Sequence, residues 1–345
     1  MSVFILSFFR RMAVLVWWAS AASASSAQAP LSWEYGDWQL VCDNTRTCRA
    51  AGYTTEAERI RSTVLIERAA GPGTPLALSW KVEVGDSAAE ELRPPVGLKA
   101  GAVRVQAAQR MLAAAEASKL LVAMLNAPHL GFEKAGSRWH LPLNGLKAVM
   151  LKMDEVQGRL DTPGAVVRRG KRAEAEVPAA LPVPKPRLLR PLNTGASEAG
   201  LAQLMWAAVR ERACWESLPD SDNPYQTAQR LDISTWLLVR ECSRGAYQAA
   251  SMAWVVSHTP PFRPQPVAFP TSRKGELRHE LVSLELMDGR VSSSAKGRGV
   301  GDCWSSAEWG WTGERFELLS ESSTGLCRGF AGGAWELPTY VTQPQ

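Results

Sequence analysis

The chain has 345 residues, a formal net charge of +5 and six cysteines. This length is enough for two domains. After the N-terminal leader no segment approaches the ~20 consecutive apolar residues that a membrane-spanning helix needs, which excludes an integral helical membrane protein once the leader is gone.

The N-terminus has the layout of a secretory signal peptide. Arg10 and Arg11 precede a short apolar stretch, and small residues follow up to Ala29. Cleavage sites fit after Ala24 and after Ala27, and we favour Ala27, which gives a signal peptide over residues 1–27. An uncleaved membrane anchor and twin-arginine export are the alternatives. We therefore expect a mature protein that is periplasmic or secreted.

The cysteines support the same location. All six lie beyond the leader, and an even number in an exported chain predicts disulfides. Distance along the sequence favours pairing in order: Cys42 with Cys48, Cys214 with Cys242, and Cys303 with Cys327. A zinc site is disfavoured, because there is no Cys-x-x-Cys pair and the four histidines are scattered. We expect no metal.

The first predicted domain covers residues 28–172. It begins with strand-forming residues from Trp33 to Val41 and a disulfide loop, continues with a hairpin, and then becomes helical. The predicted hairpin strands are Ser62–Glu67 and Leu76–Val84, and the predicted helices are Gln106–Leu125 and Gly145–Val156.

Residues 173–195 predict a linker. Closely spaced prolines favour an extended, semi-rigid chain, and the stretch around them is basic. One interpretation is a solvated spacer. The other is a segment that binds anionic envelope polymers, meaning lipid headgroups or cell-wall acids, through Coulomb attraction. Nucleic acid is not an expected partner in this compartment.

The second predicted domain covers residues 196–345. A helix over Ser197–Arg212 is followed mainly by strands, and Asp288-Gly289-Arg290 predicts a tight hairpin turn. The predicted strands are Leu231–Glu241, Ala246–Ser257, Leu284–Met287, Val291–Ser294 and Phe316–Leu319. The fold class is therefore α+β: two small β-rich domains held by disulfides, each with one or two helices.

The most distinctive segment runs from Lys296 to Cys303 and contains three glycines. Such a loop could bring its backbone to a phosphate, with Lys296 and Arg298 as counter-charges, but no helix follows it. The alternative is a glycine-dependent bend that delivers Cys303 to its partner, with Asp302 accepting backbone hydrogen bonds.

Two tryptophans give a further candidate. Trp309 and Trp311 lie two residues apart, on the same face of a predicted strand. If that face is exposed, the two rings could stack on a ligand, and if it is buried, they form part of the core. We favour the core. The candidate ligand-binding residues are Lys296, Arg298, Asp302, Trp309 and Trp311.

No catalytic or cofactor-binding residue is predicted. Ser293-Ser-Ala-Lys296 and Ser221-Asp222-Asn223 match two elements of penicillin-recognising enzymes. Their order is reversed, no Lys-Thr-Gly follows, and Ser293 lies in a predicted strand instead of opening a helix. These matches therefore do not indicate a penicillin-recognising enzyme.

Four motifs carry a family resemblance. Trp38–Cys48, Met153–Arg159, Gly245–Tyr247 and Lys296–Cys303 occur in the order found in an exported proteobacterial family, domain of unknown function 1176, which the chain resembles over nearly its whole mature length. The first domain is more distantly similar to invasion-associated locus B proteins. The resemblance implies no established activity, cofactor or catalytic residue. One departure is Trp304, where a glycine is expected after Cys303.

These observations lead to three functional hypotheses. The first is a non-catalytic binding module for an envelope component or another exported protein. The second is an inhibitor of a hydrolase such as lysozyme, with the rigid loop Asp43–Thr47 entering the enzyme's cleft. The third is an enzyme of unrecognised type in which Lys296, Arg298 and Asp302 converge.

Overall fold

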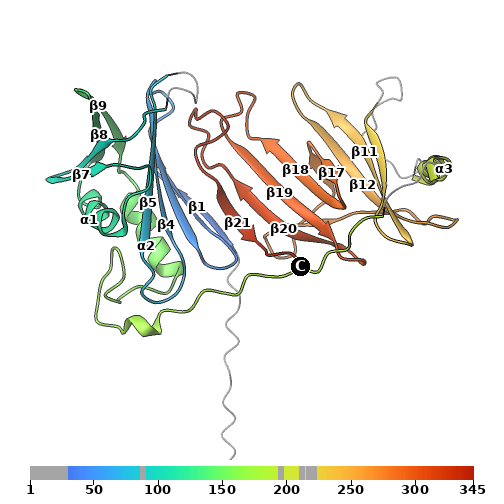
Figure 1. Ribbon diagram of the computed structural model, residues 1–345, viewed down its shortest axis with the longest axis horizontal. Coiled ribbons are helices and arrows are strands. Elements are labelled where there is room, and N and C mark those ends of the chain that lie inside the picture. The colour runs from blue at the N-terminus through green and yellow to red at the C-terminus, as the bar shows by residue number, and fades with distance from the viewer. Residues whose placement is uncertain (1–29, 86–90, 193–197, 210–213, 215–223) are drawn as a thin grey trace, which may run out of the picture.

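The computed structural model describes residues 30–85, 91–192, 198–209, 214 and 224–345. The predicted signal peptide lies outside these residues. The fold is mostly β, with several antiparallel sheets, and the described residues contain three α-helices. Figure 1 shows the first sheets at one end of the molecule, the sheet of β17 to β21 in the middle, and β11, β12 and α3 at the other end.

The first sheet is an antiparallel meander whose strands follow chain order. Cys42 lies directly opposite Cys48 across the β2–β3 hairpin, and the two form a disulfide. The Asp43 carboxylate accepts hydrogen bonds from the amides of Thr45 and Thr47, which fixes the loop between them. The strands are β1 (Leu31–Tyr35), β2 (Trp38–Cys42), β3 (Cys48–Tyr53), β4 (Arg61–Arg68) and β5 (Leu76–Glu83).

A second antiparallel sheet, in the order β7-β6-β8-β9, packs with two helices against the first. Trp38, Trp80 and Phe132 are fully buried in this shared core. The predicted hairpin and the helix near residues 145–156 are confirmed. The elements are β6 (Val96–Ala100), β7 (Val103–Ala107), α1 (Ala114–Met124), β8 (His129–Lys134), β9 (Ser137–Pro142) and α2 (Leu146–Val156).

The helix expected over Gln106–Leu125 is wrong in its first part. Residues 103–107 form β7, and α1 begins only at Ala114. Between them the chain pairs with the edge of β5: the amide of Trp80 donates to Arg110 O, and the amide of Leu112 donates to Leu78 O. Pairing with a sheet edge therefore outweighs the helix propensity of the alanine-rich sequence.

The second half contains α3 (Ala199–Val209) and three further sheets. The helix covers one face of the β10–β12 sheet, where Met205 and Val209 pack beside Trp236 and Trp254. The remaining strands are β10 (Gln226–Arg230), β11 (Thr235–Arg244), β12 (Ala249–Ser257), β13 (Gln265–Pro266), β14 (Phe269–Pro270), β15 (Leu277–Arg278), β16 (Glu280–Val282), β17 (Glu285–Met287), β18 (Arg290–Lys296), β19 (Trp304–Trp311), β20 (Phe316–Ser323) and β21 (Leu337–Val341).

A hydrophobic cluster joins the two halves of the molecule, the first containing β1 to α2 and the second α3 to β21. Val41 and Tyr53 on the outer face of the first sheet pack against Phe330, Ala334 and Leu337 from the second half. Polar contacts surround this cluster, including a hydrogen bond from the Trp335 indole to the Thr63 hydroxyl at 2.7 Å. The halves therefore share an apolar interface as well as a connecting chain.

Residues 178–192, called here the proline-rich segment, run along one edge of the molecule below both halves (Figure 1). The amide of Leu181 donates to Thr45 O in the first half, and the amide of Leu189 donates to Trp311 O in the second. The amide of Leu188 also donates to Gln345 O. Along these residues the segment is fixed to both halves. The division into domains at 173–195 stays a prediction.

The three disulfides pair in sequence order, as expected: Cys42–Cys48, Cys214–Cys242 and Cys303–Cys327. They indicate an extracytoplasmic location. None of the helices in the described part of the chain has the length and apolar character needed to cross a membrane.

Candidate functional site

The glycine-rich loop from Lys296 to Cys303 is a structural bend. Arg298 donates two hydrogen bonds to the Asp302 carboxylate, and the amide of Gly329 donates a third at 2.6 Å. The Arg298 hydrogen bonds hold the pKa of the Asp302 carboxyl below its usual range, although burial opposes them. Arg298 also pairs with Glu56 of the first half at 2.7 Å. Arg298 and Asp302 are therefore both already engaged within the protein.

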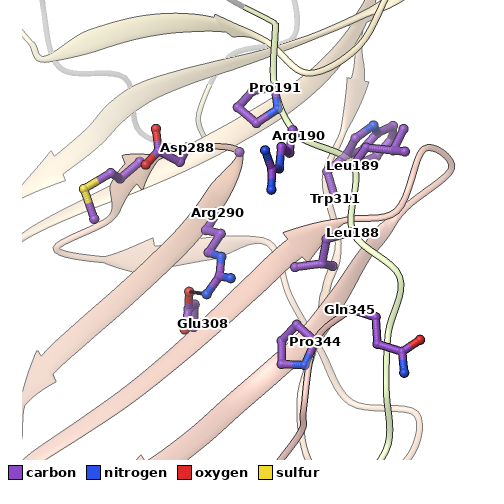
Figure 2. Close-up of a pocket in the computed structure, with 12 residues that line it drawn as sticks. Leu188, Leu189, Arg190, Pro191, Asp288, Arg290, Glu308, Trp311, Pro344 and Gln345 are labelled. Carbon is purple, nitrogen blue, oxygen red and sulfur yellow. Dashed lines mark hydrogen bonds and ion pairs between the residues drawn. The ribbon is translucent and has the colours of Figure 1, made fainter.

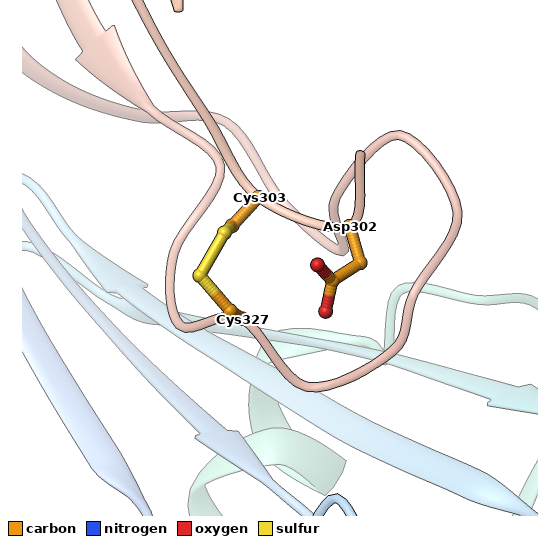
Figure 3. A group of neighbouring side chains, drawn as sticks. All are labelled: Asp302, Cys303 and Cys327. Atoms are coloured by element: carbon orange, nitrogen blue, oxygen red, sulfur yellow. A yellow bond between two sulfur atoms is a disulfide. The ribbon is translucent and has the colours of Figure 1, made fainter. Parts of the chain in front are cut away.

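Asp302 lies next to the third disulfide, and the three side chains have their polar atoms within 4.8 Å of one another (Figure 3). A metal ion takes thiolate sulfur, and the Cys303 and Cys327 sulfurs are bonded to each other. Asp302 is committed to Arg298. In the oxidised protein this group does not fit a metal ion.

Lys296 lies at the start of the bend. Its ammonium is 5.7 Å from the centre of the Tyr247 ring and 5.2 Å from that of Trp304. The Gln248 side chain accepts a hydrogen bond from the Lys296 amide at 2.6 Å. The structure thus brings the motif containing Tyr247 to the glycine-rich motif.

Trp304, the departure from the expected glycine, closes this bend. Its indole donates to Gly301 O at 3.0 Å, and Gly301 has a left-handed φ of 69°. Gly297 is required by close packing, because a Cβ there would lie 2.6 Å from the Cys303 sulfur. These contacts agree with the bend interpretation.

Trp309 and Trp311 are both core residues, with exposed fractions of 0% and 3%. The Trp309 indole donates to Pro270 O at 2.7 Å, and the Trp311 indole donates to the Asp232 carboxylate at 2.9 Å. Neither ring face is available for stacking on a ligand. Trp311 nevertheless borders a sizeable cavity.

That cavity, called here the groove, has a volume of about 680 Å³ and lies between the proline-rich segment and the β17–β18 hairpin (Figure 2). This volume is in the range of small-molecule sites. The groove was not predictable from the sequence, because its walls come from segments about 100 residues apart. Its lining includes residues 188–191, 287–290 and 344–345, with Glu308 and Trp311.

The charges of the groove are only partly paired. Arg290 on β18 forms an ion pair with Glu308 on β19 at 3.0 Å. Arg190 on the proline-rich segment has no carboxylate partner within the described part of the chain. Figure 2 shows both guanidinium side chains at the groove. Leu189 and Met287 also line the groove, with exposed fractions of 42% and 73%. Asp288 also lines the groove, and no ion pair to it is found among the described residues. Arg190, a cation in a groove with exposed apolar groups, is the feature that suits a ligand with an anionic and an apolar part.

The Met153–Arg159 motif is structural too. Asp154 is fully buried and accepts hydrogen bonds from the amides of Val166 and Val167. Arg159 is fully buried and donates to the carbonyl oxygens of Ala69 and Gly71. The Asp154 bonds hold residues 166–167 against α2, and the Arg159 bonds fasten the chain after α2 to the β4–β5 turn.

The Asp43–Thr47 loop is also enclosed by the protein. Asp43, Thr45 and Arg46 are buried, and Gln157 donates a hydrogen bond to Arg46 O. A loop in this position is not presented to an enzyme's cleft, which removes the structural basis of the inhibitor hypothesis.

Comparisons with known proteins confirm the resemblance to domain of unknown function 1176, whereas the similarity of the first domain to invasion-associated locus B proteins stays a prediction. A family model described as "Protein of unknown function (DUF1176)" matches residues 33–342. The chain is 25% identical over 357 aligned positions to the uncharacterized protein YpfG of Escherichia coli (strain K12), an alignment that covers 96% of this chain and 97% of that protein. No solved structure matches the chain.

Proposed function

The chain belongs to the DUF1176 family, and we propose that it is a non-catalytic envelope protein that binds an anionic lipid in its groove. One observation carries the proposal: the guanidinium of Arg190, without a carboxylate partner among the described residues, stands in a cavity of about 680 Å³ beside exposed apolar side chains. The disulfides support a location in which envelope lipids are accessible.

The chemistry of the groove supports a lipid over a purely polar ligand. A guanidinium forms bidentate hydrogen bonds with phosphate oxygens. Leu189 and Met287 lose exposed apolar area when an acyl chain covers them, which is favourable by ~25 cal/mol per Å². A free sugar leaves both side chains exposed to water.

Enzymatic use of the glycine-rich loop is less well supported. The Asp302 carboxylate accepts three hydrogen bonds from the protein and is almost fully buried. A general base or nucleophile needs a free oxygen within reach of the substrate.

The test is co-sedimentation of the purified, oxidised protein with vesicles. We expect binding to vesicles of phosphatidylcholine with phosphatidylglycerol and little binding to phosphatidylcholine alone. Arg190→Ala should weaken binding about tenfold or more, as expected for the loss of a charge-assisted bidentate contact.

Arg187→Ala is the matched control, because Arg187 is an exposed residue of the same segment that does not line the groove. Equal losses for the two variants would show general Coulomb attraction to the segment and contradict a groove site. Absence of binding to either vesicle, with binding to cell-wall fragments instead, would also contradict the lipid proposal.

A further inference from the structure

Two histidines meet on the outer face of the second sheet, far from the groove. His129 begins β8 and His140 lies on β9, and their ring centres are 4.5 Å apart with the planes at 76°. In the strand register His140 is opposite Gly131 and His129 is opposite Pro142, so the two imidazoles are diagonal neighbours. The sequence places them eleven residues apart, and only the hairpin brings them together.

Both rings are exposed, and neither forms a hydrogen bond or ion pair with any residue that the structure describes. His258 differs, because its Nδ1 accepts a hydrogen bond from the Trp236 indole. Gly131 has no side chain to crowd His140: a Cβ there would lie 3.8 Å from His140 Cδ2, in ordinary van der Waals contact with it. The imidazole nitrogens of the pair are thus free for a ligand.

The spacing of the rings suits one shared metal ion. Zinc–nitrogen bonds are about 2.1 Å long, and with about 1.1 Å from nitrogen to ring centre, two imidazoles at 90–110° on one ion have centres ~4.5–5.2 Å apart. The observed 4.5 Å falls at the lower end of that range. Rotation about the side-chain torsions of two exposed histidines can aim one nitrogen of each ring at the same point.

We propose that His129 and His140 form a surface site for a divalent transition-metal ion, with water in the remaining positions. Imidazole ligands suit Zn²⁺, Ni²⁺ and Cu²⁺, whereas Mg²⁺ and Ca²⁺ prefer oxygen. Lys99 lies opposite Gly131 on β6, so a positive charge is close in register. With two protein ligands and this nearby charge, the site binds more weakly than a three-ligand zinc site.

The test is calorimetric titration of the full oxidised protein with ZnCl₂ at pH 7.5. We expect one site, and a loss of affinity of about tenfold or more in His129→Ala and in His140→Ala, since each removes one of two ligands. His279→Ala is the matched control, because His279 is an exposed histidine outside the pair. It should bind as the wild type does.

A second readout uses untagged protein on immobilised Ni²⁺. Wild type and His279→Ala should be retained and elute with imidazole, and the two pair variants should not be retained. The proposal is overturned if wild type takes up no Zn²⁺, or if the pair variants bind as wild type does. Because both rings are exposed, we expect the substitutions to leave stability unchanged. Thermal unfolding curves that superimpose on that of the wild type will show that the variants are folded.

Discussion

Asp302 shows how much of one residue's role can be read from the sequence. Its place at the end of a glycine-rich run predicts a bend anchored by a carboxylate, and the structure shows the carboxylate accepting hydrogen bonds from Arg298 and Gly329. The Trp304 indole that closes the same bend was not predictable, because a hydrogen bond to Gly301 O depends on the three-dimensional course of the loop. Residue types indicate a turn, and only the three-dimensional structure shows which contacts complete it.

The anchoring of Asp302 should make stability depend on pH. Because hydrogen bonds from Arg298 lower the pKa of this carboxyl, its contribution is complete above the unfolded pKa of about 4 and is lost as the pH falls through the lower folded value. Asp302→Asn should reduce the free energy of unfolding by about 2 kcal/mol at pH 7 and by much less at pH 2.5, measured by urea denaturation.

Asp161→Asn is the control for this effect. Asp161 pairs with Arg168, and both side chains are more than half exposed, so the variant should change stability by less than about 0.5 kcal/mol. A loss in Asp302→Asn that is as large at pH 2.5 as at pH 7 would show that the carboxylate charge is not what stabilises the bend.

At the scale of elements, local sequence patterns predicted the hairpin turn correctly, whereas pairing of the chain with the edge of a distant strand was not predicted. A hairpin turn was predicted at Asp288-Gly289-Arg290, and the structure has it as a two-residue turn in which Asp288 and Gly289 both have positive φ and Arg290 already pairs with Met287. The predicted helix failed at residues 106–107, which pair with β6 as the end of β7, and at residues 110–112, where the chain joins the edge of β5. A hairpin carries its partner next to it in sequence, whereas pairing with a distant edge leaves no local pattern.

The segment after α2 gives the prediction at this scale. Burial lowers the pKa of Arg159 to about 10, yet its guanidinium donates to Gln157, Ala69 and Gly71 and pairs with Glu174. A lysine ammonium does not reproduce this planar set of donors. Arg159→Lys should therefore cost about 3 kcal/mol of unfolding free energy, with faster amide hydrogen exchange over residues 157–177.

Arg168→Lys provides the comparison, since Arg168 is an exposed arginine of the same segment. It should leave both stability and exchange unchanged. If Arg159→Lys exchanged no faster than Arg168→Lys over residues 157–177, the buried guanidinium would not be what holds the segment.

At the scale of the whole molecule, the sequence indicates two β-rich halves and three disulfides but not how the halves meet. The chain after Cys327 crosses to the outer face of the first sheet, where Phe330 packs edge to face on Tyr53 with ring centres 6.3 Å apart. Burial raises the pKa of the Tyr53 hydroxyl, as expected for a phenol enclosed by this contact. Apolar residues at these positions are equally compatible with a core inside one domain, so composition does not reveal an interface.

This interface should make the two halves unfold together. Phe330 is 1% exposed and belongs to the cluster that contains residues of both halves, so Phe330→Ala should cost about 3–4 kcal/mol and weaken the coupling between them. We expect calorimetry to show one transition for wild type and two for Phe330→Ala.

Phe269→Ala is the control, because it makes the same deletion in a core that belongs to the second half alone. It should lower stability but leave the interface between the halves intact, so the protein should still unfold in one transition. If Phe330→Ala still unfolds in one transition, the cluster is not the contact that couples the halves, and the proline-rich segment, hydrogen-bonded to both, becomes the element that transmits unfolding from one to the other.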